Sequence, residues 1–362
     1  MKICFIGPAG STHLEKWCKF LKEYGHDITI ISLVMNESEY ATVIPLRGNY
    51  NWRQSEITKV RWLFQRRVIR KTIQEIKPDI VNVHYATSYG IMAALSGIDN
   101  YILSVWGADV YDFPQKSFVH KFFLEYSLNH ASRIFSTSYA MREETKKYTQ
   151  KRIDVTPFGV DLLLFNPNKR NRVQDGKFIV GTIKTLSEKY GISYMIKAFA
   201  YACLVLPNMN LQLRIGGNGP QENEYKRLVV ELGIQERVLF LGFISQEQAA
   251  IEWANMDLGI VYSTLDSESF GVSAVEALAS GVPLIISDVP GLKESTGGGS
   301  NSLVVPRMDQ KKLDSELVGL ILDEKRRYDM AMNGRKYVEY HYSANLCFRR
   351  IEELYYDFIG KR

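Results

Sequence analysis

Two carboxylates, Glu268 and Glu276, are spaced in a way that suggests chemistry. Glu276 is the only charged residue in residues 272–280, whose other members are Val, Ala, Leu and Ser. This pattern predicts a helix that begins just after Gly271. A carboxylate on an apolar helix is costly if it is buried without a partner, and helical side chains lean toward the helix N-terminus. We therefore expect Glu276 to point toward whatever occupies the start of the helix.

The start of this helix is a candidate anion site. Free backbone N–H groups and the helix dipole favour an anion there by about 0.3–1 kcal/mol. A nucleotide diphosphate satisfies both needs, because its phosphates accept the N–H groups and its ribose diol donates two hydroxyls to Glu276. Glu268 would then reach a sugar beyond the phosphates. Alternatively, Glu276 is a partly exposed helical residue and Glu268 an acid that the helix dipole favours.

Short Ile- and Val-rich runs alternate with amphipathic stretches along the 362 residues. This alternation predicts a parallel, doubly wound α/β sheet, and the pattern restarts after a polar segment. Strands are expected at residues 2–7, 27–33, 79–84, 101–105, 133–136, 178–183, 211–215, 238–241, 258–262 and 283–287. Helices are expected at residues 13–24, 55–76, 89–95, 116–129, 140–147, 192–206, 221–232, 246–254 and 272–280, with several more up to about residue 359.

The polar segment at residues 158–176 is the best domain boundary. It predicts an N-terminal Rossmann-like domain at residues 1–166 that binds the acceptor, and a second at residues 167–342 that binds a nucleotide sugar. Residues 343–362 would form a helix that packs back on the first domain. Two such domains imply a cleft between them, with ligands beyond the carboxyl ends of the strands.

The donor stretch reads Glu268-Ser-Phe-Gly-Val-Ser-Ala-Val-Glu276 and continues Ala-Leu-Ala-Ser-Gly-Val-Pro. It closely resembles the signature of glycosyltransferase family 4, whose members are retaining, metal-independent and of GT-B fold. The resemblance extends through Ile215-Gly-Gly-Asn-Gly-Pro220, Phe240-Leu-Gly-Phe-Ile244, Phe158-Gly-Val-Asp161 and Gly25-His26, and so covers most of the chain.

The resemblance assigns roles to the donor residues. It implies that Glu276 binds the ribose and that Glu268 contacts the transferred sugar. The other positions that it implies for donor binding are Gly217, Phe243, Phe270, Gly271 and Val272.

Cations are needed where negative charge grows on the departing diphosphate. Relatives commonly place an Arg and a Lys after the first strand of the second domain, but Thr182 occupies the usual Arg position here. We carry the roles to Lys184 and Lys189. A point-like ammonium does not replace a bidentate guanidinium without cost, and two solvated loop lysines are the alternative.

The first domain departs from the family in a second place. Many members carry a His within His-Gly-x-Asp, whereas this chain has Trp106 there, followed by Asp109. Trp106 could stack on a sugar, and Asp109 could make a polar contact. His84 could substitute for the missing His or be structural. The resemblance also places Gly10, in the first loop, near the phosphate.

No general base is visible, which agrees with what the resemblance implies, an internal-return displacement in which the departing phosphate takes the acceptor proton. Glu268 and Glu276 should therefore not form a glycosidase acid/base pair. We expect a retaining hexosyltransferase that uses a UDP- or GDP-type donor in surface polysaccharide or glycolipid assembly, such as lipopolysaccharide or capsule. A sugar-nucleotide epimerase of the same fold and a non-catalytic sugar-nucleotide-binding subunit are the alternatives.

Composition narrows the setting. No run of about 18 apolar residues exists, and four scattered cysteines fit a reducing cytoplasm. The basic, Trp-containing stretch at residues 55–76 could lie on an anionic inner-membrane face and suit a saccharide or lipid-linked acceptor, or it could pack on the core with a solvated cationic face. With a net charge of only +5 and no recognisable module, we expect no nucleic acid partner. We expect neither cofactor nor metal.

Overall fold

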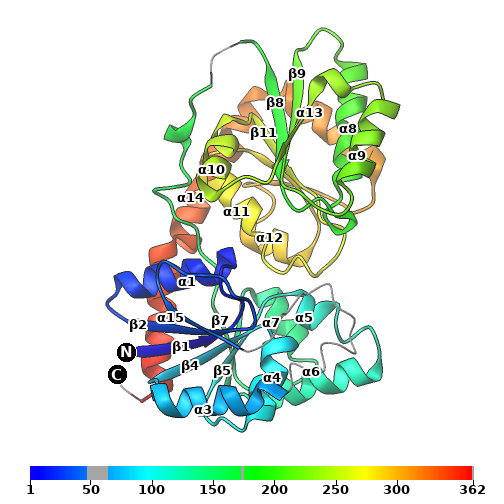
Figure 1. The fold of residues 1–362 in the computed structure, drawn as a ribbon. Helices are drawn as coiled ribbons and strands as arrows, with labels where there is room; N and C mark the ends of the chain where they lie inside the picture. The colour runs from blue at the N-terminus through cyan, green and yellow to red at the C-terminus, as the bar shows by residue number, and fades with distance from the viewer. Residues whose placement is uncertain (47–63, 173–174, 361–362) are drawn as a thin grey trace. The chain divides into compact units, whose positions relative to one another are not determined.

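A computed structural model describes residues 1–46, 64–172 and 175–360, which divide into two compact units (Figure 1). Unit 1 comprises Met1–Phe158 and Asn345–Arg362, and unit 2 comprises Gly159–Ala344. From the sequence alone, the corresponding boundaries are expected at residues 166/167 and 342/343. The polar segment that follows residue 158 thus belongs to unit 2.

Unit 1 is built on a parallel sheet with the order β3-β2-β1-β4-β5-β6-β7. The first strand is therefore central, and the order reverses between β1 and β4. The strands are β1 (Lys2–Ile6), β2 (Asp27–Ser32), β3 (Thr42–Pro45), β4 (Ile80–His84), β5 (Ile102–Val105), β6 (Arg133–Ser136) and β7 (Ile153–Val155).

Helices cover both faces of this sheet because its strands are apolar on both sides. Cys4 and Ile6 pack in one cluster with side chains of α3, α4 and α6, whereas Phe5, on the opposite face of β1, contacts Trp17 of α1. The helices are α1 (Thr12–Glu23), α3 (Arg66–Ile76), α4 (Ser88–Ser96), α5 (Ala108–Tyr111), α6 (Phe118–His130), α7 (Tyr139–Thr145) and α15 (Ala344–Phe358). The predicted helix at residues 55–76 is described only from residue 64, so its first part lies outside the described residues.

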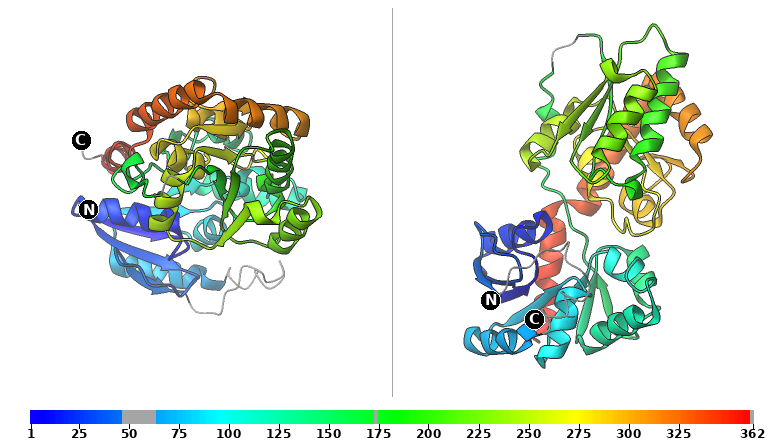
Figure 2. Two further views of the ribbon diagram at one scale, coloured as in Figure 1. Left: turned by 90° about the horizontal axis from the view of Figure 1, so that it is seen from above. Right: turned by 45° about the vertical axis from the view of Figure 1, so that its right-hand side comes forward.

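The C-terminal helix α15 is an integral part of unit 1 (Figure 2). Phe348 stacks on Phe20 of α1 with ring centroids 4.8 Å apart. The Asn82 amide donates to the Tyr355 hydroxyl at 2.7 Å, and Arg133 Nη2 lies 2.8 Å from Asp357 Oδ2. These contacts bury α15 against strands whose sequence positions lie more than 200 residues earlier.

Unit 2 repeats the plan with the strand order β10-β9-β8-β11-β12-β13, all parallel. Its reversal lies between β8 and β11. The strands are β8 (Phe178–Ile183), β9 (Leu211–Gly216), β10 (Val238–Gly242), β11 (Leu258–Val261), β12 (Leu284–Ser287) and β13 (Leu303–Val305).

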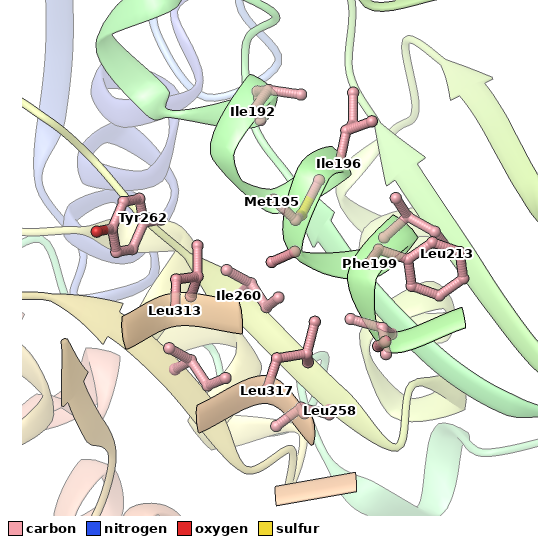
Figure 3. Close-up of a cluster of buried hydrophobic side chains, with 14 of the residues drawn as sticks. Ile192, Met195, Ile196, Phe199, Leu213, Leu258, Ile260, Tyr262, Leu313 and Leu317 are labelled. Atoms are coloured by element: carbon pink, nitrogen blue, oxygen red, sulfur yellow. The ribbon is translucent and has the colours of Figure 1, made fainter. Parts of the chain in front are cut away.

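The main core of unit 2 lies between this sheet and the helices α8, α9 and α13. Figure 3 shows Ile192, Met195, Ile196 and Phe199 of α8 facing side chains of β11 and α13. The helices of the unit are α8 (Ile192–Val205), α9 (Glu222–Glu231), α10 (Gln246–Asn255), α11 (Val272–Ala279), α12 (Pro290–Thr296), α13 (Gln310–Leu322) and α14 (Glu324–Tyr342). In the described part of the chain, no helix has the length and apolar character needed to cross a membrane.

Candidate active site

The loops that follow β8 and β11 lie at the reversal of strand order in unit 2. Such a switch point is where open α/β sheets bind ligands. Lys184 directly follows β8, and Glu268 lies in the loop between β11 and α11. Adjacent parallel strands end at the same edge of the sheet, so residues 84 positions apart in sequence are brought together.

Lys184 and Glu268 form a buried ion pair. Lys184 Nζ lies 2.7 Å from Glu268 Oε2, and the two side chains are 12% and 9% exposed. The Ser263 hydroxyl donates to the same carboxylate oxygen at 3.2 Å. Lys184 Nζ also lies 4.6 Å from the centroid of the Tyr190 ring, a cation–π distance. The pair is therefore held on several sides rather than solvated.

Burial and pairing shift the pKa of each member of this pair in opposite directions. Burial alone would lower the pKa of Lys184, but the neighbouring Glu268 carboxylate, with Tyr190 and Glu276, raises that pKa above its usual value. Burial alone would raise the pKa of Glu268, but Lys184, Lys189 and the Ser263 hydroxyl lower it below its usual value. Both groups stay ionised at neutral pH, so the site keeps a fixed ammonium beside a fixed carboxylate.

Lys189 lies on the other side of the Glu268 loop. Its Nζ donates to the Ser267 carbonyl at 3.2 Å and lies 5.3 Å from the Tyr190 ring centroid. Its own carbonyl accepts the Thr264 backbone N–H at 2.8 Å. The structure therefore brings Lys189, Lys184 and Glu268 into one cluster around Tyr190, and neither lysine is a solvated loop residue.

Gly217 supports the loop that carries Lys184. The Lys184 N–H donates to the Gly216 carbonyl at 2.9 Å, and the Leu186 N–H donates to the Asn218 carbonyl at 2.9 Å. Gly217 has a φ of +118°, and a Cβ there would lie 2.0 Å from the Lys184 carbonyl oxygen. Only glycine permits this approach of the two loops.

Helix α11 begins where the sequence predicts it. Gly271 caps it with a φ of +74°, and the Ser273 hydroxyl donates to the Ile183 carbonyl at the end of β8 at 2.7 Å. Phe270 is 2% exposed and packs edge-on against Tyr342, so the peptide before the helix is anchored in the core. Val272 is half-buried at the first helical position.

Glu276 is 5% exposed in a helix whose sequence contains no other charge. Its carboxylate is close enough to Lys184 to raise the pKa of that lysine. The alternative of a partly exposed helical residue is therefore wrong. A buried carboxylate in the second turn of α11 is suited to accept hydroxyl donors.

Phe243 stands apart from this cluster. It follows the edge strand β10, two strands away from β8, and is 79% exposed. Its donor-binding role stays a prediction.

Thr182 occupies the position expected for an Arg. It is 1% exposed within β8, so its side chain is not accessible to a ligand beyond the end of that strand.

His84 ends β4 at the reversal of strand order in unit 1. It has no exposed surface, and its two ring nitrogens have no hydrogen-bond partner among the described residues. Phe5, Trp17 and Trp106 pack edge-on against its ring at centroid distances of 4.9–5.3 Å. Burial, with a smaller effect of His13, lowers the pKa of His84 to about 3. His84 is thus a neutral, sealed ring, which favours the structural reading.

Asp109, predicted to be available for a polar contact with the acceptor, instead contacts the backbone of its own unit. It has no exposed surface, and its carboxylate accepts the backbone N–H groups of Ala86, Gly107 and Trp106 at 2.8, 2.8 and 3.1 Å. Its side chain therefore joins the loops after β4 and β5 and positions Trp106. Trp106 itself is half-buried, so part of this residue stays accessible to a ligand.

Gly10 is exposed in the loop after β1, and its N–H donates to Glu15 Oε1 at 3.3 Å. Its φ of +76° and the Asn36 side chain, 2.6 Å from where a Cβ would be, make glycine necessary. Its proximity to a phosphate stays a prediction.

Three residues of the two sites were missed by the sequence reasoning. Ser263 donates to Glu268, and Arg307 binds Asp266 in the loop that carries Glu268. Each lies two residues after a strand of unit 2, and a polar residue just beyond a strand is the signal that could have found them.

His13 is the second residue of α1 and is half-buried. Its ring stacks on Phe158 with centroids 4.3 Å apart and lies edge-on to Trp106 at 5.6 Å. Among the described residues, no group of three His, Cys, Asp or Glu side chains gathers as a metal site would require.

Two family models match this chain, and several solved structures share its fold. A family model described as glycosyl transferase 4-like matches residues 2–138, and one described as glycosyl transferases group 1 matches residues 166–337. Sucrose-phosphate synthase from Thermosynechococcus elongatus superposes over all of both chains with a TM-score of 0.84 at 18% identity. Anabaena HepE in complex with UDP-glucose gives 0.81 at 18% identity over 98% of this chain and 99% of its own.

A curated relative is N-acetyl-alpha-D-glucosaminyl L-malate synthase from Bacillus anthracis, 24% identical over 77% of this chain and 74% of its own. The fold and the two family models together identify a glycosyltransferase of GT-B fold. More specifically, the chain belongs to the family 4 type of glycosyltransferases, with the group 1 domain forming most of unit 2.

Proposed function

We propose that this glycosyltransferase moves a sugar from a nucleotide-diphosphate donor to a saccharide or lipid-linked acceptor with retention of configuration. The observation that carries the proposal is the Lys184–Glu268 ion pair at the switch point, beside the buried Glu276 and the start of α11. The helix N-terminus and the cation suit the diphosphate of a sugar nucleotide, and the carboxylates can accept hydrogen bonds from its hydroxyl groups.

Each part of the donor has a matching group. The diphosphate is placed at the start of α11, the ribose diol at Glu276 and the transferred sugar at Glu268. A UDP-type donor is the first choice because the similar HepE structure contains UDP-glucose. A GDP-type donor has the same diphosphate and ribose, so base recognition distinguishes the two.

Leaving-group stabilisation falls to Lys184 and Lys189. Negative charge grows on the diphosphate as the glycosidic bond breaks, and preorganised cations in a buried site stabilise it. Burial of Lys184 strengthens this effect, because the surrounding dielectric is low. The acceptor proton passes to the departing phosphate, so no protein base is required.

EDTA should leave activity unchanged in this metal-free mechanism. A loss of activity that magnesium or manganese restores would contradict it.

A thermal-shift screen over UDP- and GDP-sugars tests the proposal first. A ligand that binds only the native state raises its melting temperature. With the donor identified, proton NMR of the product gives the configuration at the new bond, for which we expect retention. Release of a free 2-epimer would instead support an epimerase, and donor binding with no turnover on any acceptor would support a non-catalytic subunit.

The acceptor side includes a cationic helix face. Arg66, Arg67, Arg70 and Lys71 of α3 are exposed, whereas Ile69 is buried in the core of unit 1. We place this face against the anionic inner surface of a membrane, where each Lys or Arg contributes roughly 1 kcal/mol. Sedimentation with phosphatidylglycerol vesicles but not with phosphatidylcholine vesicles would support this placement, and equal binding to both would contradict it.

A further inference from the structure

The Arg307 guanidinium joins three strand ends of unit 2. Arg307 follows β13 and is 26% exposed. Its Nη1 lies 2.6 Å from Asp266 Oδ1, in the loop after β11. Its Nε donates to Asp288 Oδ1 at 3.1 Å, after β12, and its backbone N–H donates to the same oxygen at 3.0 Å. One side chain therefore links the loops that follow β11, β12 and β13.

The loop that carries Glu268 is held from two sides. On the β8 side, Lys189 binds the Ser267 carbonyl and, through its own carbonyl, Thr264. On the β13 side, Arg307 binds Asp266, two residues before Glu268. The Tyr262 hydroxyl also donates to the Pro306 carbonyl, so the residue before Arg307 is itself attached to the end of β11. Glu268 lies between these two attachments.

We infer that Arg307 is a positioning residue that holds Glu268, through Asp266, in the place where it contacts the donor sugar. The inference rests on the proposed function. Arg307 touches neither Glu268 nor Lys184 in any interaction described, so its effect passes through the loop.

The charges are consistent with a lasting link. The partial burial of Arg307 opposes its charge, but Asp266 and Asp288 raise its pKa above the usual value. Burial opposes ionisation of Asp288, but Arg307 lowers the pKa of that carboxyl. A single exposed ion pair adds little to stability. Its importance here lies in geometry, because a displacement of about 1 Å at a reacting group can reduce the rate about 100-fold.

The test compares the effect of each variant on affinity for the sugar nucleotide with its effect on affinity for the nucleoside diphosphate. Calorimetry on the full chain would measure affinity for UDP and for UDP-glucose, or for GDP and GDP-mannose if the screen selects them. For Arg307→Ala we expect affinity for the sugar nucleotide to fall at least fivefold and kcat at least tenfold. Affinity for the nucleoside diphosphate should change less than twofold, because Glu276 and α11 are untouched. Arg307→Lys should recover part of the loss.

Asp266→Asn provides an independent test should Arg307→Ala fold poorly. It should reproduce the sugar-specific loss, and the double variant Arg307→Ala with Asp266→Asn should be no worse than either single variant. Arg326→Ala is the matched control, because Arg326 is an exposed arginine of α14 that pairs with Glu316 at 3.9 Å. It should change none of these quantities.

Three results would overturn the inference. They are equal losses of affinity for nucleotide and sugar nucleotide, additive losses in the double variant, and no change in Arg307→Ala. A wild-type protein that binds no sugar nucleotide would instead defeat the proposed function itself. The two failures are thus distinguished by the wild-type measurement.

Discussion

Lys184 and Glu268 neutralise each other, with Lys184 Nζ 2.7 Å from Glu268 Oε2. The lysine is predicted to contact the diphosphate and the carboxylate to contact the sugar, so the pair joins residues that would bind neighbouring parts of one donor. A bound donor would meet a cation that is already oriented by its partner. The same pairing makes each residue costly to remove alone.

Removing one member of this pair should destabilise unit 2. Glu268→Gln or Lys184→Met leaves a buried charge unpaired, which costs about 3–5 kcal/mol, whereas the double variant should cost less than the two single variants together. Urea denaturation, monitored by circular dichroism, measures the free energy of unfolding of the single and double variants. Lys226→Met is the control, since its exposed pair with Glu222 should contribute less than about 1 kcal/mol. Additive losses in the double variant would contradict the pairing.

Glu276→Ala should weaken nucleotide binding. Loss of a charged hydrogen-bond acceptor costs about 1.5–3 kcal/mol, or roughly 10- to 150-fold in Kd. Calorimetry with UDP or GDP measures this, and Glu231→Ala on the exposed face of α9 serves as control. Affinity equal to that of the wild type would remove the ribose assignment.

Lys189→Ala should lower turnover more than donor affinity. A cation aimed at charge that develops during bond breaking is worth about 10²–10³ in kcat, and we expect the donor Kd to change less than fivefold. Steady-state kinetics with calorimetry separates the two. Lys197→Ala, at an exposed position of α8, is the control. A large loss of affinity with kcat unchanged would show a ground-state role.

His84 should make the stability of unit 1 depend on pH. Its pKa is lowered to about 3 in the folded protein, so its contribution is present above pH 6.5 and is lost as pH falls toward 3. The loss approaches about 1.4 kcal/mol per pH unit in that window. His84→Leu should flatten the slope in denaturation experiments at pH 4–7, whereas His130→Leu, exposed on α6, should not. An unchanged slope in His84→Leu would contradict the buried neutral ring.

The central strands of both sheets are predictable from sequence because they are buried on both faces. β6 and β8 begin and end at the predicted residues. The strands without a prediction, β3, β7 and β13, lie at sheet edges and have only three or four residues. Edge strands have fewer neighbours, so they need no continuous apolar run, and β3 even ends in a proline, which an edge tolerates.

Glu276 is predictable from the sequence because a single charge within an apolar helical run can be recognised without knowing the fold, whereas the roles of Lys184 and Lys189 depend on the resemblance to the family. The burial of Glu276 agrees with the pattern. The pairing of Lys184 with Glu268 depends on which strands are neighbours, and the order of strands is not a local property of the sequence. The backbone contacts of Asp109 could not be predicted for the same reason, because its partner Ala86 follows a different strand.

The last helix, α15, has a consequence for how the protein is made. Unit 1 includes Met1–Phe158, but Trp17 and Phe20 lack their Phe348 contact until α15 has been synthesised. On the ribosome, unit 2 can therefore finish folding while unit 1 still exposes apolar surface. Nascent chains stalled before residue 345 should present that surface to chaperones.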